Sequence, residues 1–360
     1  MPSEGLPAAA GRGANADPDP ADNYRALKLA VALPYTDTPW NEVVEYVQVA
    51  EKLGYEAVFV AEAYSYDAVS IMAALAMKTD RIKIGAGILN VFSRSPALLA
   101  QSAAALDMLS NGRFILGLGT SGPQVVQGWH GVPFVKPLQR TREVVEIVRM
   151  ALRRERLTYD GETIKLDMGL KLINHPVRSE IPIIIASLGP KNLEMTGEIA
   201  DGWMPTLFAP NHMDVFRPHL EAGLQKSGRD WSALEIVPAV ITGVYDDVDV
   251  VRQMVKPYLA LYVGGMGSRE RNFYNQLVQR YGYMDEARQV QDLYLAGDKA
   301  GAAAAIPDAL VDETSAIGSP ERCREKLREL EAAGVTMPVL GIMAFDQEQR
   351  LKTLEALAPS

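Results

Sequence analysis

The sequence predicts an α/β fold, a (β/α)8 TIM barrel with insertions after the fourth and seventh strands. Short apolar runs alternate with longer amphipathic segments from Leu27 onward, and eight such runs occur in the 360 residues. Most of these runs are continuous in Val, Ile and Leu, as parallel strands covered on both faces require. A doubly wound sheet, the alternative, needs fewer strands and a switch point. No change in composition marks a second domain, so we expect one domain over residues 25–360 behind a disordered tail, residues 1–24.

The expected strands are short and are bounded by Gly, Pro or charged residues. They cover residues 27–34, 55–62, 81–89, 113–119, 181–187, 201–207, 233–244 and 334–344. The first expected helix shows the usual start and stop signals, with Thr38 as N-cap, Pro39 in the first turn and Gly54 after the end. A hairpin turning at Asp160-Gly161 follows the fourth strand. A long, largely helical stretch separates the seventh strand from the eighth.

Charge and composition exclude several classes of function. The net charge is −9 and the pI is near 5.2, without a basic block, so no nucleic-acid or membrane partner is expected. No apolar run is long enough to span a membrane, and the N-terminus lacks the pattern of a signal peptide. The single cysteine, Cys323, cannot form an internal disulfide, which suits a cytoplasmic protein. The histidines show no metal-ligand spacing, so no metal site is expected.

A glycine-rich run, GLGTSG at residues 117–122, has the spacing of a dinucleotide-binding fingerprint. That fingerprint requires a helix directly after the glycines, with its N-terminus facing the pyrophosphate. Here Pro123 and Gly128 break any regular helix, and Glu143 lies inside an expected surface helix. We therefore interpret the run as a strand that ends at the carboxyl-terminal mouth of the barrel, where such barrels keep their sites. Trp129, in the loop that follows, is expected to anchor that loop.

The third expected strand ends in a similar way, with Gly85 and Gly87 in the run GAGILN. Glycines near a strand end indicate either a bulge with close approach of a ligand or tight packing inside the barrel. The residues alone leave both interpretations open.

Three longer stretches resemble a known family. They are YEAVFVAEAYSYDA, TDRIKIGAGILNVFSRSPALLAQSAAALDMLSNGRFILGLG and SGPQVVQGWHG. They resemble the luciferase-like monooxygenase superfamily and, within it, the coenzyme F420-dependent oxidoreductases, which include methylenetetrahydromethanopterin reductase. The stretches IASLGPKNLEMTGEIADGWMP and YLALYVGGMGSRERNFYNQLVQRYGY resemble the same branch, so the likeness covers residues 27–345. Sister branches use FMN in similar barrels.

The resemblance implies a deazaflavin site at the barrel mouth. It implies a bend after the third strand, with a cis peptide between Gly87 and Ile88 supporting the central ring of coenzyme F420. Ile88 and Leu89 would contact one ring face, Asn90 would donate to the pyrimidine edge, and Glu62 would lie near the ring system. The other cofactor-binding residues that it implies are Gly119, Thr120 and Ser121 along the ribityl chain and Ala186, Ser187, Leu188 and Gly189 at the phosphate. There the N–H groups at the start of a helix would hold the anion.

The sequence departs from some relatives at two catalytic positions. The relatives that oxidise sugar phosphates carry a His after the strand-two acid and a Glu after the fourth strand, where this chain has Ala63 and Gly122. The remaining candidates for a catalytic proton donor are Glu62, Tyr64, His130 and Asp67. Three arginines expected near the mouth are either anion-binding groups or solvated surface charges: Arg94, Arg269 and Arg271.

We expect a cytoplasmic oxidoreductase that transfers a hydride between the reduced deazaflavin and a small organic acceptor with a C=C, C=N or C=O bond. Two alternatives stay open. One is an FMN-dependent monooxygenase in the same barrel. The other is a catalytically quiet cofactor-binding protein, which the missing His and Glu keep open. Because relatives are commonly dimers, a homodimer is expected.

Overall fold

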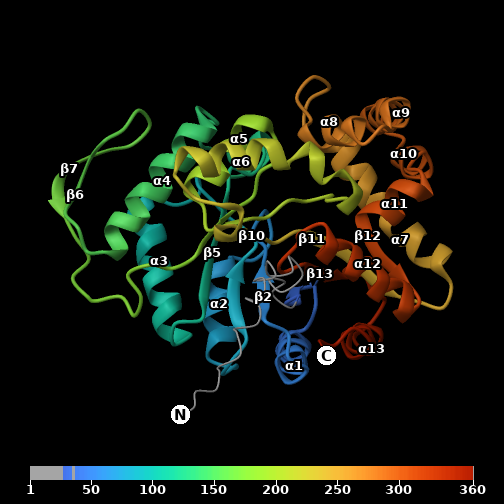
Figure 1. Cartoon of the computed structure of the whole chain (residues 1–360), viewed down its shortest axis with the longest axis horizontal. Helices are drawn as coiled ribbons and strands as arrows, with labels where there is room; N and C mark the ends of the chain where they lie inside the picture. The colour runs from blue at the N-terminus through green and yellow to red at the C-terminus, as the bar shows by residue number, and fades with distance from the viewer. Residues whose placement is uncertain (1–26, 35–36, 360) are drawn as a thin grey trace, which may run out of the picture.

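A curled parallel sheet surrounded by helices forms the body of the protein (Figure 1). The structure is a computed structural model that describes residues 27–34 and 37–359. The tail expected over residues 1–24 lies outside the described residues. The predicted barrel-type α/β fold is confirmed.

The sheet of the described residues runs in the order β10-β9-β8-β5-β3-β2-β1-β13-β11-β12, with β4 paired to β5. Its strands are β1 (Ala30–Ala32), β2 (Ala57–Val60), β3 (Lys83–Ala86), β4 (Leu89–Asn90), β5 (Phe114–Gly119), β8 (Ile183–Ile185), β9 (Gly202–Trp203), β10 (Glu235–Ile236), β11 (Ala239–Val244), β12 (Ser315–Gly318) and β13 (Val339–Ile342). An isolated parallel bridge between Thr206 and Ala239 joins the β9 side of the sheet to β11. Because the strands of this sheet pair in parallel, their carboxyl ends lie at the same end of the barrel.

Two details of the strands differ from the prediction. The strand expected over residues 233–244 is divided into β10 and β11, because Pro238 between them has no N–H to donate to a ladder. β12 was missed, since its sequence, SAIG, is too short and too rich in small residues to show a strand pattern. It pairs in parallel with β11.

Helices cover the outside of the sheet. They are α1 (Trp40–Lys52), α2 (Ala68–Ala76), α3 (Pro96–Leu109), α4 (Pro137–Leu152), α5 (Pro190–Ile199), α6 (Arg217–Lys226), α7 (Val248–Ala260), α12 (Pro320–Ala332) and α13 (Gln347–Ala356). The N-cap of α1 is Pro39 and not Thr38, one residue later than expected. In the part of the chain that the structure describes, no helix is both long and apolar enough to cross a membrane.

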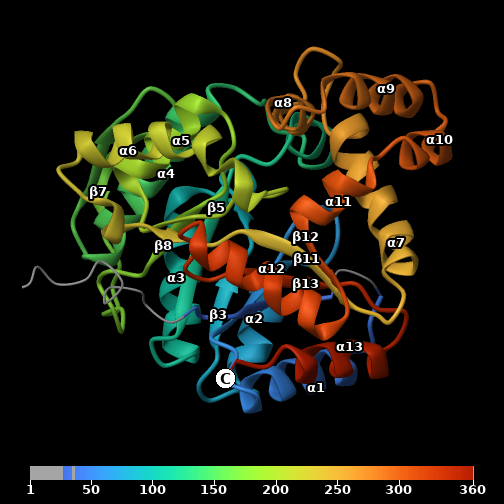
Figure 2. The ribbon, with the colours of Figure 1, turned by 45° about the vertical axis from the view of Figure 1, so that its right-hand side comes forward.

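Both expected insertions are present. After β5 come the wide π-helical turn η2 (Gln124–Trp129) and, beyond α4, the antiparallel hairpin β6 (Leu157–Asp160) and β7 (Lys165–Leu170). Between α7 and β12 lie η5 (Leu261–Gly265), α8 (Phe273–Arg280), α9 (Met284–Leu295), α10 (Lys299–Ala304) and α11 (Asp308–Thr314). Figure 2 shows α8, α9 and α10 grouped at the same end of the barrel as α5 and α6.

The buried side chains form two separate cores. The smaller fills the inside of the barrel, and its members are Ala30, Ala57, Phe59, Ile115, Ile184, Met204, Val237, Met337 and Val339. The larger lies between the sheet and the helices and takes the alternate residues of the same strands, such as Val58 and Ile183. This alternation follows from the two-residue period of a strand. It also decides which residues at the strand ends point into the mouth.

Candidate active site at the carboxyl ends of the barrel strands

Small residues form the floor of the barrel mouth. Ala32 and Ile88 pack directly on the inner core, and Ala61, two residues beyond the inward-pointing Phe59, is exposed. At Gly119 a Cβ would lie 2.9 Å from Ile88 Cδ1 and 3.5 Å from the Ala186 Cβ. We call Ala32, Ala61, Ile88, Gly119 and Ala186 the mouth floor. Apart from that of Ile88, these side chains are short or absent, so they leave room for a flat molecule above the floor.

The bend between β3 and β4 contains the expected cis peptide, Gly87-Ile88. The two glycines before it are explained by packing. A Cβ at Gly85 would lie 2.5 Å from the Phe59 ring, and one at Gly87 would lie 3.2 Å from Phe59 Cβ. Of the two interpretations left open by the sequence, tight packing inside the barrel is therefore the one that the structure supports at Gly85 and Gly87. Leu89, beyond the bend, is fully buried beside β5.

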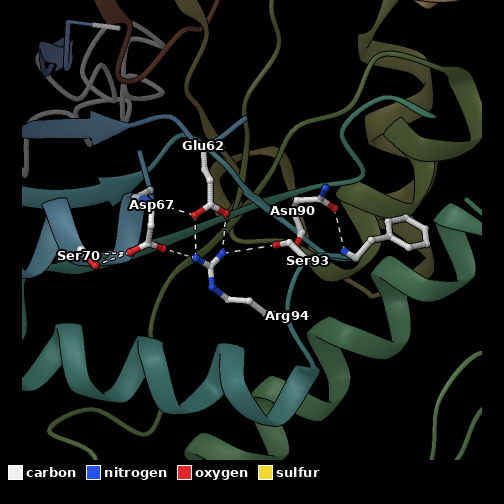
Figure 3. A network of polar contacts seen from close by, with 8 residues as sticks. Glu62, Asp67, Ser70, Asn90, Ser93 and Arg94 are labelled. Carbon is white, nitrogen blue, oxygen red and sulfur yellow. Dashed lines mark hydrogen bonds and ion pairs between the residues drawn. The ribbon is translucent and has the colours of Figure 1, made fainter. Parts of the chain in front are cut away.

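Asn90 presents a buried donor that no group of the protein accepts. The residue is 1% exposed, and its Oδ1 accepts the N–H of Phe92 at 2.8 Å. Its Nδ2 is buried and has no hydrogen-bond partner among the described residues. Figure 3 shows Nδ2 on the side of the amide away from Phe92. An unpaired buried donor is unfavourable in the free protein, so this atom fits a carbonyl acceptor on the edge of a bound ring.

Glu62 is held by an arginine. Arg94 donates to Glu62 from both Nη atoms, at 2.5 and 2.7 Å, and also contacts Asp67 (Figure 3). The side chains of Glu62 and Arg94 are only 9% and 14% exposed. The hydrogen bond with Glu62 is the main cause that raises the pKa of Arg94. A carboxylate with both oxygens occupied by a guanidinium is an acceptor, so this geometry favours a positioning role for Glu62 over proton donation.

Asp67 and the three arginines can now be placed. Burial raises the pKa of Asp67, but hydrogen bonds from Ser70 and the charge of Arg94 outweigh it and lower the pKa. Asp67 is thus a carboxylate that caps α2 through Ser70. Arg94 is a mostly buried ion-pair member, so the surface-charge interpretation is wrong for it. Arg269 is exposed and pairs with Asp292, and Arg271 is exposed.

The loop after β5 carries three of the predicted residues. Thr120 Oγ1 donates to the Ser121 carbonyl at 3.1 Å, and Ser121 has a positive φ of 55°. The His130 N–H donates to the Val125 carbonyl at 3.1 Å and ends η2, while its ring is partly exposed. Trp129 is 63% exposed and does not anchor the loop. The fully buried Val126 anchors it instead.

The dinucleotide interpretation is excluded by the residues around β5. Glu143 is fully buried and accepts hydrogen bonds from Gln139, from the Glu162 N–H and from Thr163. It therefore fastens the β6–β7 hairpin to α4 and is not at a strand end. Gly117 has a packing reason, because a Cβ there would lie 1.8 Å from the Ala86 carbonyl oxygen.

The segment after β8 leads into α5. Ser187 is buried, its hydroxyl is 2.8 Å from Thr196 Oγ1, and its carbonyl accepts the Trp203 indole N–H at 2.9 Å. The side chain of Ser187 is thus directed into the protein. Gly189 is the N-cap of α5 and provides no side-chain cap, which leaves the first N–H groups of this helix to other acceptors. Leu188 packs against the outer core.

Sequence reasoning missed two features of this site. The pairing of Glu62 with Arg94 joins residues 32 positions apart; the adjacency of two strand ends was its only signal. A group of tyrosines at the end of α7 and in the insertion that follows was also missed: Tyr258, Tyr262 and Tyr274. The four-residue spacing in YLALY places the first two on one helix face.

Comparisons with known proteins agree with this geometry. Residues 25–337 match the family described as luciferase-like monooxygenase. A Mycobacterium tuberculosis protein, named for a proposed dependence on coenzyme F420, is 39% identical over 91% of this chain and 99% of its own length. The 5,10-methylenetetrahydromethanopterin reductase of Archaeoglobus fulgidus is 32% identical over 85% of this chain and 90% of its own.

A solved structure gives the same result in three dimensions. The coenzyme F420-dependent tetrahydromethanopterin reductase from Methanopyrus kandleri superposes with a TM-score of 0.80 at 26% identity, covering 92% of this chain and 97% of that one. The family match extends over most of the chain, and the first relative aligns almost end to end. The chain therefore belongs to the luciferase-like monooxygenase family.

Proposed function

We propose that the protein is a coenzyme F420-dependent oxidoreductase that transfers a hydride between the reduced deazaflavin and a small organic acceptor. The single observation that carries the proposal is the buried, unpartnered Nδ2 of Asn90, a residue that pairs in the sheet with Gly119 of the mouth floor. A ring with a carbonyl at its edge would satisfy this atom if it lay on the floor with that edge toward Asn90. The names of the Archaeoglobus and Methanopyrus relatives support the deazaflavin as that ring.

The residues of this chain would hold and orient the cofactor. Ile88 supports one face of the ring, Asn90 fixes its edge, and the backbone of residues 119–121 follows the side chain of the cofactor. The N–H groups at the start of α5, after Gly189, suit the acidic end. When bound, the deazaflavin supplies two electrons as a hydride.

Glu62 and the candidate proton donors would take different parts. The Arg94 ion pair fixes the side chain of Glu62, which would position the ring and its neighbours. Tyr64, two residues beyond Glu62, is 58% exposed, and His130 lies in the loop after β5. Both remain candidates to deliver a proton to the reduced acceptor.

Equilibrium binding of oxidised coenzyme F420 and of FMN to the purified protein tests the proposal. Binding is measured by the quenching of ligand fluorescence. We expect the deazaflavin to bind tightly and FMN to bind weakly. In Asn90→Asp the Oδ1 acceptor for Phe92 is kept and the free donor is replaced by an acceptor, so the deazaflavin Kd should rise about tenfold or more. Asn111→Asp, at an exposed turn before β5, is the matched control.

Each other outcome overturns part of the proposal. A preference for FMN would assign the protein to the flavin-dependent monooxygenases of the same fold. Binding of neither ligand would remove the site assignment. An Asn90→Asp protein that binds the deazaflavin as the wild type does would remove Asn90 from the ring edge.

A further inference from the structure

A cavity of about 580 Å³ adjoins the mouth floor on the side of β1 and β2. Leu33, after β1, and Val60, at the end of β2, are among the residues that line it. Ala61 belongs both to this lining and to the mouth floor, so the cavity opens beside the place proposed for the deazaflavin ring. Its volume is that of a site for a small organic molecule.

The walls of the cavity are held in place by hydrogen bonds at the strand ends. The Leu33 N–H donates to the Phe59 carbonyl at 2.8 Å, which fixes the end of β1 beside β2. Glu62 Oε1 accepts the Ala68 N–H at 3.2 Å and so closes the loop that carries Tyr66 from β2 to α2. Fixed walls of this kind suit a site that is formed before its ligand arrives.

Two aromatic side chains of the lining are left uncovered by the protein. Trp40, the first residue of α1, is 41% exposed, and Tyr66 is 69% exposed. Val43 and Ile71 add apolar surface to the same lining. Exposed aromatic faces beside apolar walls favour a flat ring, and they attract a cation more strongly than a neutral ring.

The charges around the cavity are negative. Among the described residues that line it, Asp37 is the only charged one, and it is exposed. Close to the lining, Glu62 and Asp67 share the single guanidinium of Arg94, so this group carries one formal negative charge (Figure 3). A cavity with acidic groups and without Lys, Arg or His in its described lining attracts a cation and repels an anion.

From this arrangement we propose that the cavity is the subsite for the hydride acceptor and that the acceptor is a flat, positively charged nitrogen heteroaromatic compound. The inference rests on the proposed hydride transfer. Trp40 and Tyr66 contact the charged ring, and Asp37 lies toward its charge. The apolar walls, of which Leu33 and Val60 are members, take the hydrocarbon part of the molecule.

The reduction of such an acceptor balances without a proton donor. The hydride from the reduced deazaflavin forms a C–H bond at a ring carbon that is conjugated with the nitrogen. The π-electron pair moves to that nitrogen and cancels its positive charge, while one proton of the reduced cofactor passes to water. The reaction therefore needs neither the His nor the Glu that Ala63 and Gly122 replace, nor a proton from Glu62, which is bound to Arg94.

Binding of three ring compounds of similar outline to the full-length protein tests the subsite without turnover. 10-Methylacridinium is a cation, acridine is neutral in mildly alkaline buffer, and anthracene-2-carboxylate is an anion. We expect the wild type to bind 10-methylacridinium about tenfold more tightly than acridine and to bind the anion weakest. Asp37→Asn should reduce the preference for the cation about fivefold and leave acridine binding unchanged. Asp167→Asn, which removes an exposed carboxylate on β7, is the matched control and should keep the full preference.

Several outcomes would overturn the subsite. They are a wild type that binds acridine or the anion as well as the cation, an unchanged preference in Asp37→Asn, and an equal loss of preference in Asp167→Asn, which would show attraction by the net charge alone. The deazaflavin Kd separates this inference from the proposed function. An Asp37→Asn protein with an unchanged cofactor Kd and weaker cation binding supports the subsite. A wild type that binds 10-methylacridinium with the expected pattern but binds no deazaflavin keeps the cation site and overturns the proposed function.

Discussion

The two ends of the barrel use their polar groups differently. At the amino ends of the strands, Arg113 donates five hydrogen bonds to the carbonyls and hydroxyl of the turns around it, and Arg178 pairs with the fully buried Asp107. At the carboxyl ends, the amide of Asn90 has a buried donor without a partner, and Tyr64 is exposed. Arg113 and Arg178 are thus paired within the protein, whereas the amide donor of Asn90 is not.

The contrast predicts that polar residues at the amino end contribute to stability and that those at the carboxyl end contribute to ligand binding. The paired polar groups of Arg113, Arg178 and Asp107 hold the turns of the amino end together. Buried polar groups that lack a partner are unfavourable in the free protein and gain on binding. Substitutions at the two ends should therefore change different measured quantities.

The largest effect on stability is expected at the amino end. Arg178→Met would leave the fully buried Asp107 without its charged partner. We expect the free energy of unfolding to fall by about 3 kcal/mol, the lower end of the range for buried pairs, because Arg178 itself is 31% exposed. Urea unfolding followed by circular dichroism measures this change.

The control for Arg178→Met is Lys165→Met, which removes an exposed ion pair with Asp160 and should leave the unfolding midpoint unchanged. The deazaflavin Kd of folded Arg178→Met should equal that of the wild type. A large rise in this Kd at a temperature where the variant is folded would contradict the idea that the amino end affects stability and not binding.

Two glycines on β5 sharpen the comparison within a single strand. A Cβ at Gly117 would meet the Ala86 carbonyl at 1.8 Å, so Gly117→Ala must move backbone and should destabilise the protein by about 2 kcal/mol. At Gly119 the Cβ would meet the tip of Ile88 at 2.9 Å, and a side chain yields more easily. Gly119→Ala should therefore lower stability less and displace Ile88 into the mouth.

The two variants should change the deazaflavin Kd and the unfolding midpoint in opposite proportions. Gly119→Ala should raise the deazaflavin Kd about tenfold with a small change in the unfolding midpoint, and Gly117→Ala should do the reverse. Equal losses of affinity in both variants would mean that the mouth floor does not extend to Gly119.

The sequence allowed the body of the barrel to be predicted more fully than its mouth. Continuous apolar runs identified strands such as β5 and β8, because burial on both faces leaves a strong local pattern. β12 gave no such pattern, and its strand character depends on pairing with β11. Tertiary contacts decide elements this short.

At the mouth, residue types were predicted better than their partners. The family resemblance pointed to Asn90 and to the cis peptide after Gly87, which the structure contains. It did not reveal that Arg94 occupies both oxygens of Glu62, since two strand ends bring these residues together. The space around Gly85 is filled by Phe59, a contact across strands that glycine content alone does not distinguish from ligand approach.

The smallest expected effect concerns Cys323, on α12 behind the barrel wall. Its thiol is fully buried against the carbonyls of Gly243 and Ala316, and burial raises its pKa to about 12 from an ordinary value of 9.0. The folded protein therefore keeps the thiol protonated while the unfolded chain ionises above about pH 9. Its contribution to stability is complete below that pH and is lost as the pH rises toward 12.

At pH 10 the wild type should thus have lost about 1 kcal/mol of unfolding free energy relative to pH 8, beyond any loss seen in Cys323→Ala. Urea unfolding of both proteins at the two pH values measures the difference, in which the cavity left by alanine cancels. The same burial predicts that a thiol reagent labels Cys323 only at the rate of unfolding. Rapid labelling of the folded protein would show that α12 separates from β11 and β12 while the rest of the protein stays folded. The firm packing of the barrel body would then not include this helix.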